Sequence, residues 1–252
     1  MADIIIFLIC VVCPVVFWFK FFQWEDRAEP EPKKLLIKAF LLGCLGAVLL
    51  SIIEYFVFYF LLGPRAETLL DVSNLAASTV TGDTFVLLIG AGILEETGKF
   101  ILLKEYIYDK ADFNQIADGV FYGATLALGF SFVENIFYFI GFLHQGNTVF
   151  LASAAAIRGL LSVSVHILAT SISGLALGRM KFRMPHSWKP VILALALAAL
   201  LHASYNVLIQ FQIWGLLGAV LLLGLVLRYI LHSINLPDSK VVWRLVTPKK
   251  DI

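Results

Sequence analysis

The sequence predicts an all-α protein, a polytopic transmembrane helix bundle of seven or eight spans that forms one domain over residues 1–252. Composition is the first reason: 60% of the 252 residues are hydrophobic and the mean hydropathy is +0.88, whereas soluble domains are about 45–50% apolar. The apolar residues also form long runs, close to the ~20 residues that cross a bilayer as a helix. No polar stretch is long enough to form a second domain.

The apolar runs, taken in order, predict seven spans. They cover residues 4–22, 35–62, 84–103, 119–143, 149–178, 190–210 and 213–231. Pro30 and Pro32 mark the first linker as a loop. The connection over 63–83 is the longest, and we expect a short surface helix there at about 69–77. If the chain has one span more or fewer than seven, the difference lies in this connection.

Basic residues alternate between the two sides of this topology. Lysines and arginines lie in the connections after the first, third and fifth spans and in the C-terminal tail, whereas the opposite connections hold only Arg65. Because cytoplasmic loops carry the excess of Lys and Arg, the N-terminus is expected outside and the C-terminus in the cytoplasm. The net charge of +1 gives no reason to expect a nucleic-acid partner.

The third span carries Glu95, Glu96 and Lys99 near its middle. A charged side chain at the bilayer centre costs at least ~2.5–3.5 kcal/mol, so such residues are usually functional. Lys99 lies four residues after Glu95 and three after Glu96, so it can pair with either acid but cannot neutralise both. A purely structural ion pair between two helices is the alternative interpretation.

The next three spans each contain further ionisable residues, namely Glu134, His166 and His202. Counting ~1.5 Å per residue along each helix places them within ~10 Å of Glu95 along the membrane normal. The core of spans three to six, within residues 84–210, is therefore expected to enclose one polar site.

Such a cluster suits hydrolysis assisted by zinc, which binds imidazole nitrogens and carboxylate oxygens and leaves one position open. On this interpretation Glu134, His166 and His202 bind the metal, and Glu95 or Glu96 acts as general base.

Supporting residues are expected around the histidines. Thr170 and Asn206 each lie one turn after a histidine and could orient it. Arg158 could pair with Glu134 or with the acidic pair, which is a structural task. In a metal-free version a glutamate in a low-dielectric cavity activates water directly, and the histidines with Asn206 stabilise the oxyanion. The residues leave both versions open.

This pattern resembles the PrsW family of bacterial intramembrane proteases, which are related to the type II CAAX prenyl proteases. The prenyl proteases have EExxxR and a histidine where this chain has Lys99 and Glu134, so the resemblance is to PrsW. The matching residues are Glu95-Glu96-x-x-Lys99, Phe130-x-x-x-Glu134 with Asn135, Arg158, His166 with Thr170, and His202 with Asn206.

The resemblance implies a multi-pass enzyme of the bacterial cytoplasmic (inner) membrane. It would cut a single-span membrane protein, in the manner of the first, site-1 cleavage of an anti-sigma factor. The resemblance leaves open whether the enzyme uses zinc. The sequence does not predict the oligomeric state.

Two other function classes fit parts of the pattern. A proton- or cation-coupled transporter also places acids and histidines at mid-depth, but it usually has inverted repeats and broken helices. No clear repeat is present, and no proline occurs between Arg65 and Lys181. A non-catalytic membrane scaffold would not need every motif acid and histidine intact. Glu54, in the second span, has no motif around it and is expected to be a packing or interface residue.

Overall fold

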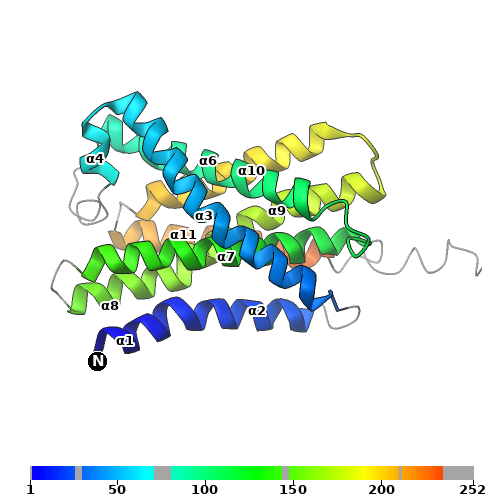
Figure 1. Cartoon of the computed structure of the whole chain (residues 1–252), viewed down its shortest axis with the longest axis horizontal. Coiled ribbons are helices and arrows are strands. Elements are labelled where there is room, and N and C mark those ends of the chain that lie inside the picture. The colour runs from blue at the N-terminus through cyan, green and yellow to red at the C-terminus, as the bar shows by residue number, and fades with distance from the viewer. Residues whose placement is uncertain (1, 26–29, 71–80, 144–147, 210–211, 235–252) are drawn as a thin grey trace, which may run out of the picture.

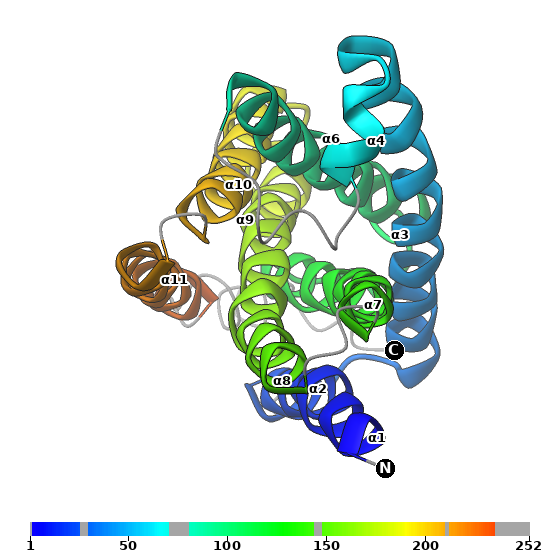
Figure 2. The same cartoon turned by 90° about the vertical axis from the view of Figure 1, so that its left-hand side faces the viewer.

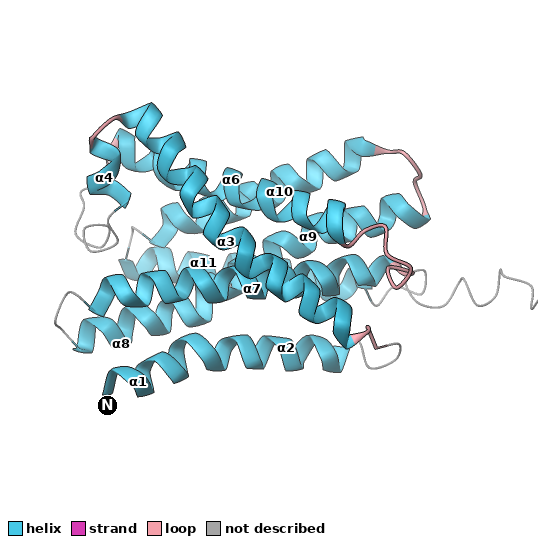
Figure 3. Ribbon diagram, viewed as in Figure 1, coloured by secondary structure: helices cyan, strands magenta, loops and turns pink. Residues whose placement is uncertain are grey.

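A computed structural model describes residues 2–25, 30–70, 81–143, 148–209 and 212–234, and in these segments every regular element is a helix (Figure 3). Two short π-helical turns interrupt longer helices. The elements are α1 (Ala2–Phe7), η1 (Leu8–Val12), α2 (Cys13–Glu25), α3 (Lys33–Leu62), α4 (Arg65–Leu70), α6 (Gly82–Tyr106), α7 (Ile116–Leu143), α8 (Thr148–Ile157), η2 (Arg158–Ser162), α9 (Val163–Phe182), α10 (Trp188–Leu208) and α11 (Gln212–Ile234). The predicted all-α class is confirmed.

Among the described residues, five helical segments are long and apolar enough to cross a bilayer: Ala2–Glu25, Lys33–Leu62, Ile116–Leu143, Thr148–Phe182 and Trp188–Leu208. Helix α6 has 25 residues but holds three charged residues near its middle. In α11 the described apolar segment, Val220–Ile230, is shorter than a membrane span. The protein is therefore a helical membrane protein, and the count of seven spans stays a prediction. The surface helix expected at about 69–77 falls mostly outside the described residues, although α4 lies in the same connection.

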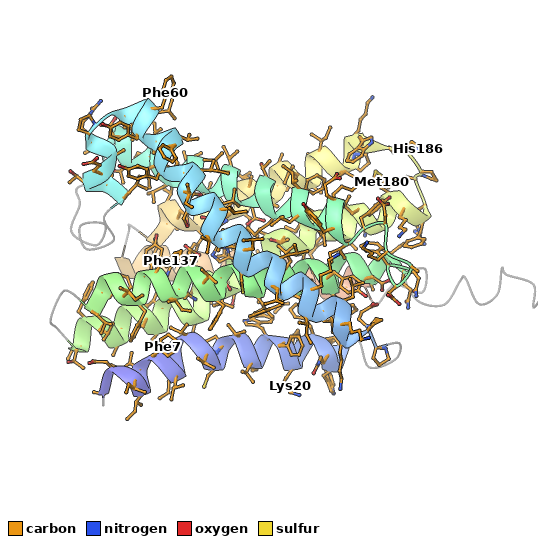
Figure 4. All side chains as sticks on the ribbon, viewed as in Figure 1. Phe7, Lys20, Phe60, Phe137, Met180 and His186 are labelled. Atoms are coloured by element: carbon orange, nitrogen blue, oxygen red, sulfur yellow. The ribbon has the colours of Figure 1, made fainter. Side chains whose placement is uncertain are left out.

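The bundle has two distinct ends (Figure 1). The N-terminus and α4 lie at one end, which we call the α4 end. The α6–α7 and α9–α10 connections lie at the other, which we call the basic end because it carries Lys104, Lys110, Lys181 and Arg183. In Figure 4, Phe60 is near the first end and His186 near the second. The assignment of the basic end to the cytoplasm remains a prediction.

Helices α7 and α9 form the centre of the bundle, with α3, α6, α10 and α11 around them (Figure 2). Residues 116–131 of α7 are all buried, and nearly all of 163–178 in α9 are buried. Glycines permit the close approach: a Cβ added to Gly119 or to Gly174 would lie 2.0 Å from the carbonyl oxygen of the other residue. Small residues at helix crossings are typical of membrane bundles.

The basic end is closed by a buried apolar cluster, which we call the basic-end cluster. Lys181 Nζ donates hydrogen bonds to the carbonyls of Tyr108 (2.6 Å) and Phe113 (2.8 Å), so the α6–α7 connection is held against α9. The cluster consists of Leu35, Leu36, Ala39, Leu103, Ile107, Phe113, Tyr122, Leu126, Ala176, Leu177, Met180, Val191 and Ala194.

Large apolar side chains are exposed along the outside of the bundle. Phe60 is 88% exposed and Leu221 is 70% exposed. Extensive exposed apolar surface is unfavourable in water but is expected where the surroundings are lipid.

The Gly174→Ala substitution should lower the free energy of unfolding by about 1–3 kcal/mol, because the added methyl group would overlap the backbone of α7. Thermal unfolding of the detergent-solubilised protein measures this. Gly224→Ala is the matched control, since no atom lies within 4 Å of a Cβ added there. Equal unfolding temperatures for the two variants would contradict the close α7–α9 contact.

Candidate functional site

The site forms where α6 packs against both α9 and α10. Glu95, Glu96 and Lys99 of α6 are buried, as are His166 of α9 and His202 of α10. The two imidazole rings lie 4.7 Å apart, centroid to centroid, at an interplanar angle of 81°. Glu95, His166 and His202, three of the residues predicted to share a depth, are thus brought together, with Glu96 and Lys99 beside them.

The close approach of α6 and α10 depends on Gly92. A Cβ added to Gly92 would lie 2.8 Å from the backbone nitrogen of Ala203, the residue after His202. The absence of a side chain at this crossing lets His202 reach the carboxylates one turn further along α6.

Both oxygens of Glu96 are engaged. Oε1 lies 2.5 Å from Lys99 Nζ and 3.0 Å from His202 Nδ1. Oε2 accepts a hydrogen bond of 3.0 Å from Thr170 Oγ1. Because its partners come from three helices, Glu96 is held in one orientation and joins α6, α9 and α10.

Lys99 connects the acids to the second histidine. Its Nζ lies 2.9 Å from His166 Nδ1 and 3.6 Å from Glu95 Oε2, and 4.4 Å from the ring centroid of Phe130. An ammonium group only donates, so Nδ1 of His166 is the acceptor and the ring proton lies on Nε2. Lys99 therefore determines the tautomer of His166.

Nε2 of His166 faces Glu134 on α7, and the two atoms Nε2 and Oε2 are 2.6 Å apart. The other oxygen of Glu134 lies 2.8 Å from Arg158. Arg158 also donates to Asn135 Oδ1 at 3.0 Å, and its guanidinium lies 3.4 Å from the ring centroid of Tyr138. Of the two partners considered for Arg158, the structure shows Glu134. Arg158 is the first residue of the π-helical turn η2, an element that often occurs at functional sites.

Glu95 differs from Glu96 in having an oxygen without a hydrogen-bond partner among the described residues. This oxygen, Oε2, is buried and lies 3.6 Å from Lys99 Nζ, 3.7 Å from His166 Nδ1 and 4.0 Å from His202 Nδ1. Glu95, His166 and His202 each offer one ligand atom, and these atoms lie within 4.8 Å of one another. Two imidazoles and one carboxylate are a set that zinc accepts. The sequence placed Glu134 rather than Glu95 in that set, so both carboxylates are candidates.

A cavity of about 290 Å³ adjoins these residues. It is formed by α3, α4, α6, α7 and α10 and extends toward the α4 end, where Leu69 and Leu70 line it. Its polar lining residues are Ser51, Glu54, Tyr55, Glu95, Glu134, Tyr138, Arg158, Tyr205 and Asn206. The described part of the chain therefore offers a path to Glu95 from the α4 end.

Glu54 is the residue whose position was not foreseen. It was expected to serve in packing or at an interface, but it lines the same cavity as Glu95 and Glu134. The sequence did contain an indication of this role, because a charged side chain within an apolar span is usually functional.

Thr170 and Asn206 have partners other than the expected histidines. Thr170 donates to Glu96, and Asn206 Nδ2 donates to the Leu88 carbonyl at 3.2 Å. Side chains one turn apart on a helix lie side by side and both project toward the neighbouring helix. Each residue therefore contacts α6 and not the histidine on its own helix.

A second cavity, of about 570 Å³ between α9, α10 and α11, is larger but apolar. Arg179 is the one charged residue in its described lining, which contains neither a carboxylate nor a histidine. The chemistry that the chain offers is therefore concentrated in the smaller cavity.

Comparison with known proteins identifies the family. The model of the PrsW family intramembrane metalloproteases matches residues 31–232. Protease PrsW of Bacillus subtilis (strain 168) is 31% identical over 196 residues, which cover 77% of this chain and 78% of the relative. Protease PrsW of Clostridioides difficile (strain 630) is 27% identical over 235 residues, which cover 92% and 88%. No solved structure matches the chain.

The family match over residues 31–232 includes every helix that contributes to the site. These matches decide against the transporter and the non-catalytic scaffold as the function class. The chain belongs to the PrsW family of intramembrane metalloproteases and is a membrane-embedded peptidase.

Proposed function

We propose that this peptidase hydrolyses a peptide bond in or next to the membrane span of a single-span protein, with Glu95 as the general base. One contrast supports this assignment. Glu95 lines the cavity, and its Oε2 has no hydrogen-bond partner among the described residues and only a long contact of 3.6 Å with Lys99, whereas both oxygens of Glu96 are bound to Lys99, His202 and Thr170. A base must reach the proton that it takes, so the engaged carboxylate is the less suitable of the two.

In the proposed step, Glu95 takes a proton from a water molecule in the cavity while the water oxygen attacks the scissile carbonyl carbon. Negative charge then develops on the carbonyl oxygen, and we assign its stabilisation to the amide of Asn206, which lines the cavity. As the C–N bond breaks, the departing nitrogen receives the proton carried by Glu95. The products are a carboxylic acid and an amine.

The residues present also fit a zinc ion. His166 Nε2 and Glu134 Oε2 lie 2.6 Å apart, so an ion bound to both would take the place of the proton that Nε2 carries in the metal-free site. Zinc bound by Glu134, His166 and His202 would supply Lewis-acid polarisation of the substrate carbonyl. A carboxylate that binds the metal cannot also take the proton, so this assignment leaves Glu95 as the base. Arg158 would neutralise the remaining oxygen of Glu134.

Lys99 has a positioning role in this proposal. It neutralises Glu96 and holds His166 in one tautomer through Nδ1. The buried ammonium is itself stable only because these acceptors surround it.

The substrate class follows from the family resemblance together with the position of the site within the bundle. We propose a membrane-spanning regulator such as an anti-sigma factor, cut at the first of its cleavage sites. We place the enzyme in the cytoplasmic membrane, with the basic end of the bundle facing the cytoplasm.

The Glu95→Gln variant should cleave a single-span reporter protein at least ~100-fold more slowly than the wild type, because the base is lost while the shape is kept. The assay uses purified enzyme and reporter together in liposomes, with product followed by gel electrophoresis. Glu105→Gln, an exposed glutamate at the basic end of the same helix, is the matched control and should cleave normally. Wild-type rates for Glu95→Gln would refute the assignment.

The metal content of variant proteins shows whether Glu95 or Glu134 is the carboxylate that binds the metal. We expect about one zinc per chain in the purified wild type and in Glu95→Gln, and a loss of metal in Glu134→Gln and in the His166→Ala, His202→Ala double variant. Elemental analysis of each detergent-solubilised protein gives the answer. Loss of metal from Glu95→Gln with retention in Glu134→Gln would make Glu95 the ligand. A metal-free wild type that cleaves the reporter in the presence of chelators would establish the glutamate mechanism without metal.

The Lys99→Met substitution should destabilise the protein by about 3–5 kcal/mol, because it leaves buried carboxylates without their cation. The Lys99→Met, Glu96→Gln double variant should regain much of this loss, since the uncompensated charge is then removed. Thermal unfolding in detergent measures both. Lys104→Met is the control: its partner Asp109 is 73% exposed at 3.7 Å, so at most ~1 kcal/mol should be lost. If the losses of unfolding free energy caused by Lys99→Met and Glu96→Gln were simply additive, the two residues would not form an energetically coupled ion pair.

A further inference from the structure

We propose that Glu54 binds a cationic side chain of the substrate, a lysine or an arginine, on the α4 side of the scissile bond. This rests on the proposed function, because it concerns how the same cavity holds the substrate. It adds a specificity-determining residue on α3, a helix that contributes none of the proposed catalytic groups.

The position of Glu54 within the cavity is the first argument. Glu54 and Glu95 line the same space. Glu54 lies eight residues before the last residue of α3, and Glu95 thirteen residues after the first residue of α6. At ~1.5 Å per residue these positions are about 12 and 20 Å from the α4-end termini of their helices. A substrate segment that reaches Glu95 from the α4 end would therefore pass Glu54.

The second argument is that one oxygen of Glu54 lacks a donor. Its Oε1 is buried without a hydrogen-bond partner among the described residues. Two hydroxyl groups close to it in α3 are engaged elsewhere: Ser51 donates to the Ala47 carbonyl at 2.8 Å, and Tyr55 to Glu67 at 3.4 Å. A buried carboxyl group without a donor is costly, so a donor from the substrate would relieve a penalty that already exists.

The charge of the cavity decides which donor is favoured. Glu54, Glu95 and Glu134 line it, and Arg158 is the sole cation in its described lining. Arg158 lies 2.8 Å from Glu134, and Lys99, behind the lining, lies 2.5 Å from Glu96 and 3.6 Å from Glu95, so among the described residues neither cation pairs with Glu54. A backbone N–H could donate the hydrogen bond that Glu54 Oε1 lacks, but it could not balance the excess negative charge of the cavity. An ammonium or guanidinium group does both.

The apolar lining fits the rest of such a side chain. Phe58, Leu87 and Phe137 line the cavity together with Glu54. A lysine or arginine can bury its methylene stem against apolar surface while its charged end reaches a carboxylate. Aspartate or glutamate at the same substrate position would be repelled by the acids.

A substrate panel tests the proposal. The probes are single-span reporters that carry Lys, Met or Glu in turn at each of the four residues on either side of the cleaved bond. The readout is the ratio of kcat/KM between reporters that differ only at that position. At one or more positions on the α4 side, the wild type should prefer Lys over Met about tenfold or more, as expected for a charge-assisted hydrogen bond. Glu54→Gln should bring this ratio close to one, and Glu54→Lys should reverse the preference in favour of Glu.

Glu67→Gln is the matched control, because Glu67 is an exposed glutamate on α4 that does not line the cavity, and it should keep the wild-type ratio. A merely structural role of Glu54 would lower all rates together and leave the ratio unchanged, which would overturn the proposal. A wild type that cleaves the reporters without any preference for Lys would overturn it as well, while the proposed function would stand. A wild type that cleaves none of them would refute the proposed function and, with it, the role of Glu54.

Discussion

A charge in the middle of a bilayer is tolerated only when partners surround it, and the arrangement of this bundle follows from that constraint. Helix α6 carries two carboxylates and an ammonium, and these groups are supplied with partners by α9 and α10. Thr170 and the two histidines can reach them only because small residues such as Gly92 let the helices approach closely. The same contacts that make the charges tolerable also bring the reactive groups together, so stability and chemistry depend on one set of residues.

Much of this could be predicted from the sequence, because helical geometry is regular. The rise per residue is constant, so ionisable residues counted along successive spans can be compared in depth before their neighbours are known. That comparison brought Glu95, Glu134, His166 and His202 to one level, and the structure places both acids within 4 Å of His166, which contacts His202. Composition was sufficient for the all-helical class, since runs of this length and apolarity have few other structural solutions in a membrane.

What could not be predicted depends on which surfaces meet across helices. Periodicity shows that Thr170 shares a face with His166, but not that both face α6 and that Thr170 therefore bonds Glu96. The position of Glu54 next to the site requires the path of α3 across α6 and α7, which is determined by side-chain packing and not by the sequence of α3 alone. The choice of metal ligand has the same origin, because Glu95 and Glu134 differ in their neighbours and not in their chemistry.

The closed basic end has a consequence for the cell as well as for the enzyme. A hydrolase needs water in the bilayer, and a continuous file of water and acids across the whole membrane would let protons leak down their gradient. Here the polar cavity beside Glu95 extends toward the α4 end, whereas the basic-end cluster packs apolar side chains between α3, α6, α7, α9 and α10 on the other side. Lys181 holds the α6–α7 connection over that cluster. On the proposed function, water would reach the scissile bond from the α4 end, and the apolar packing on the other side would keep the membrane electrically insulating.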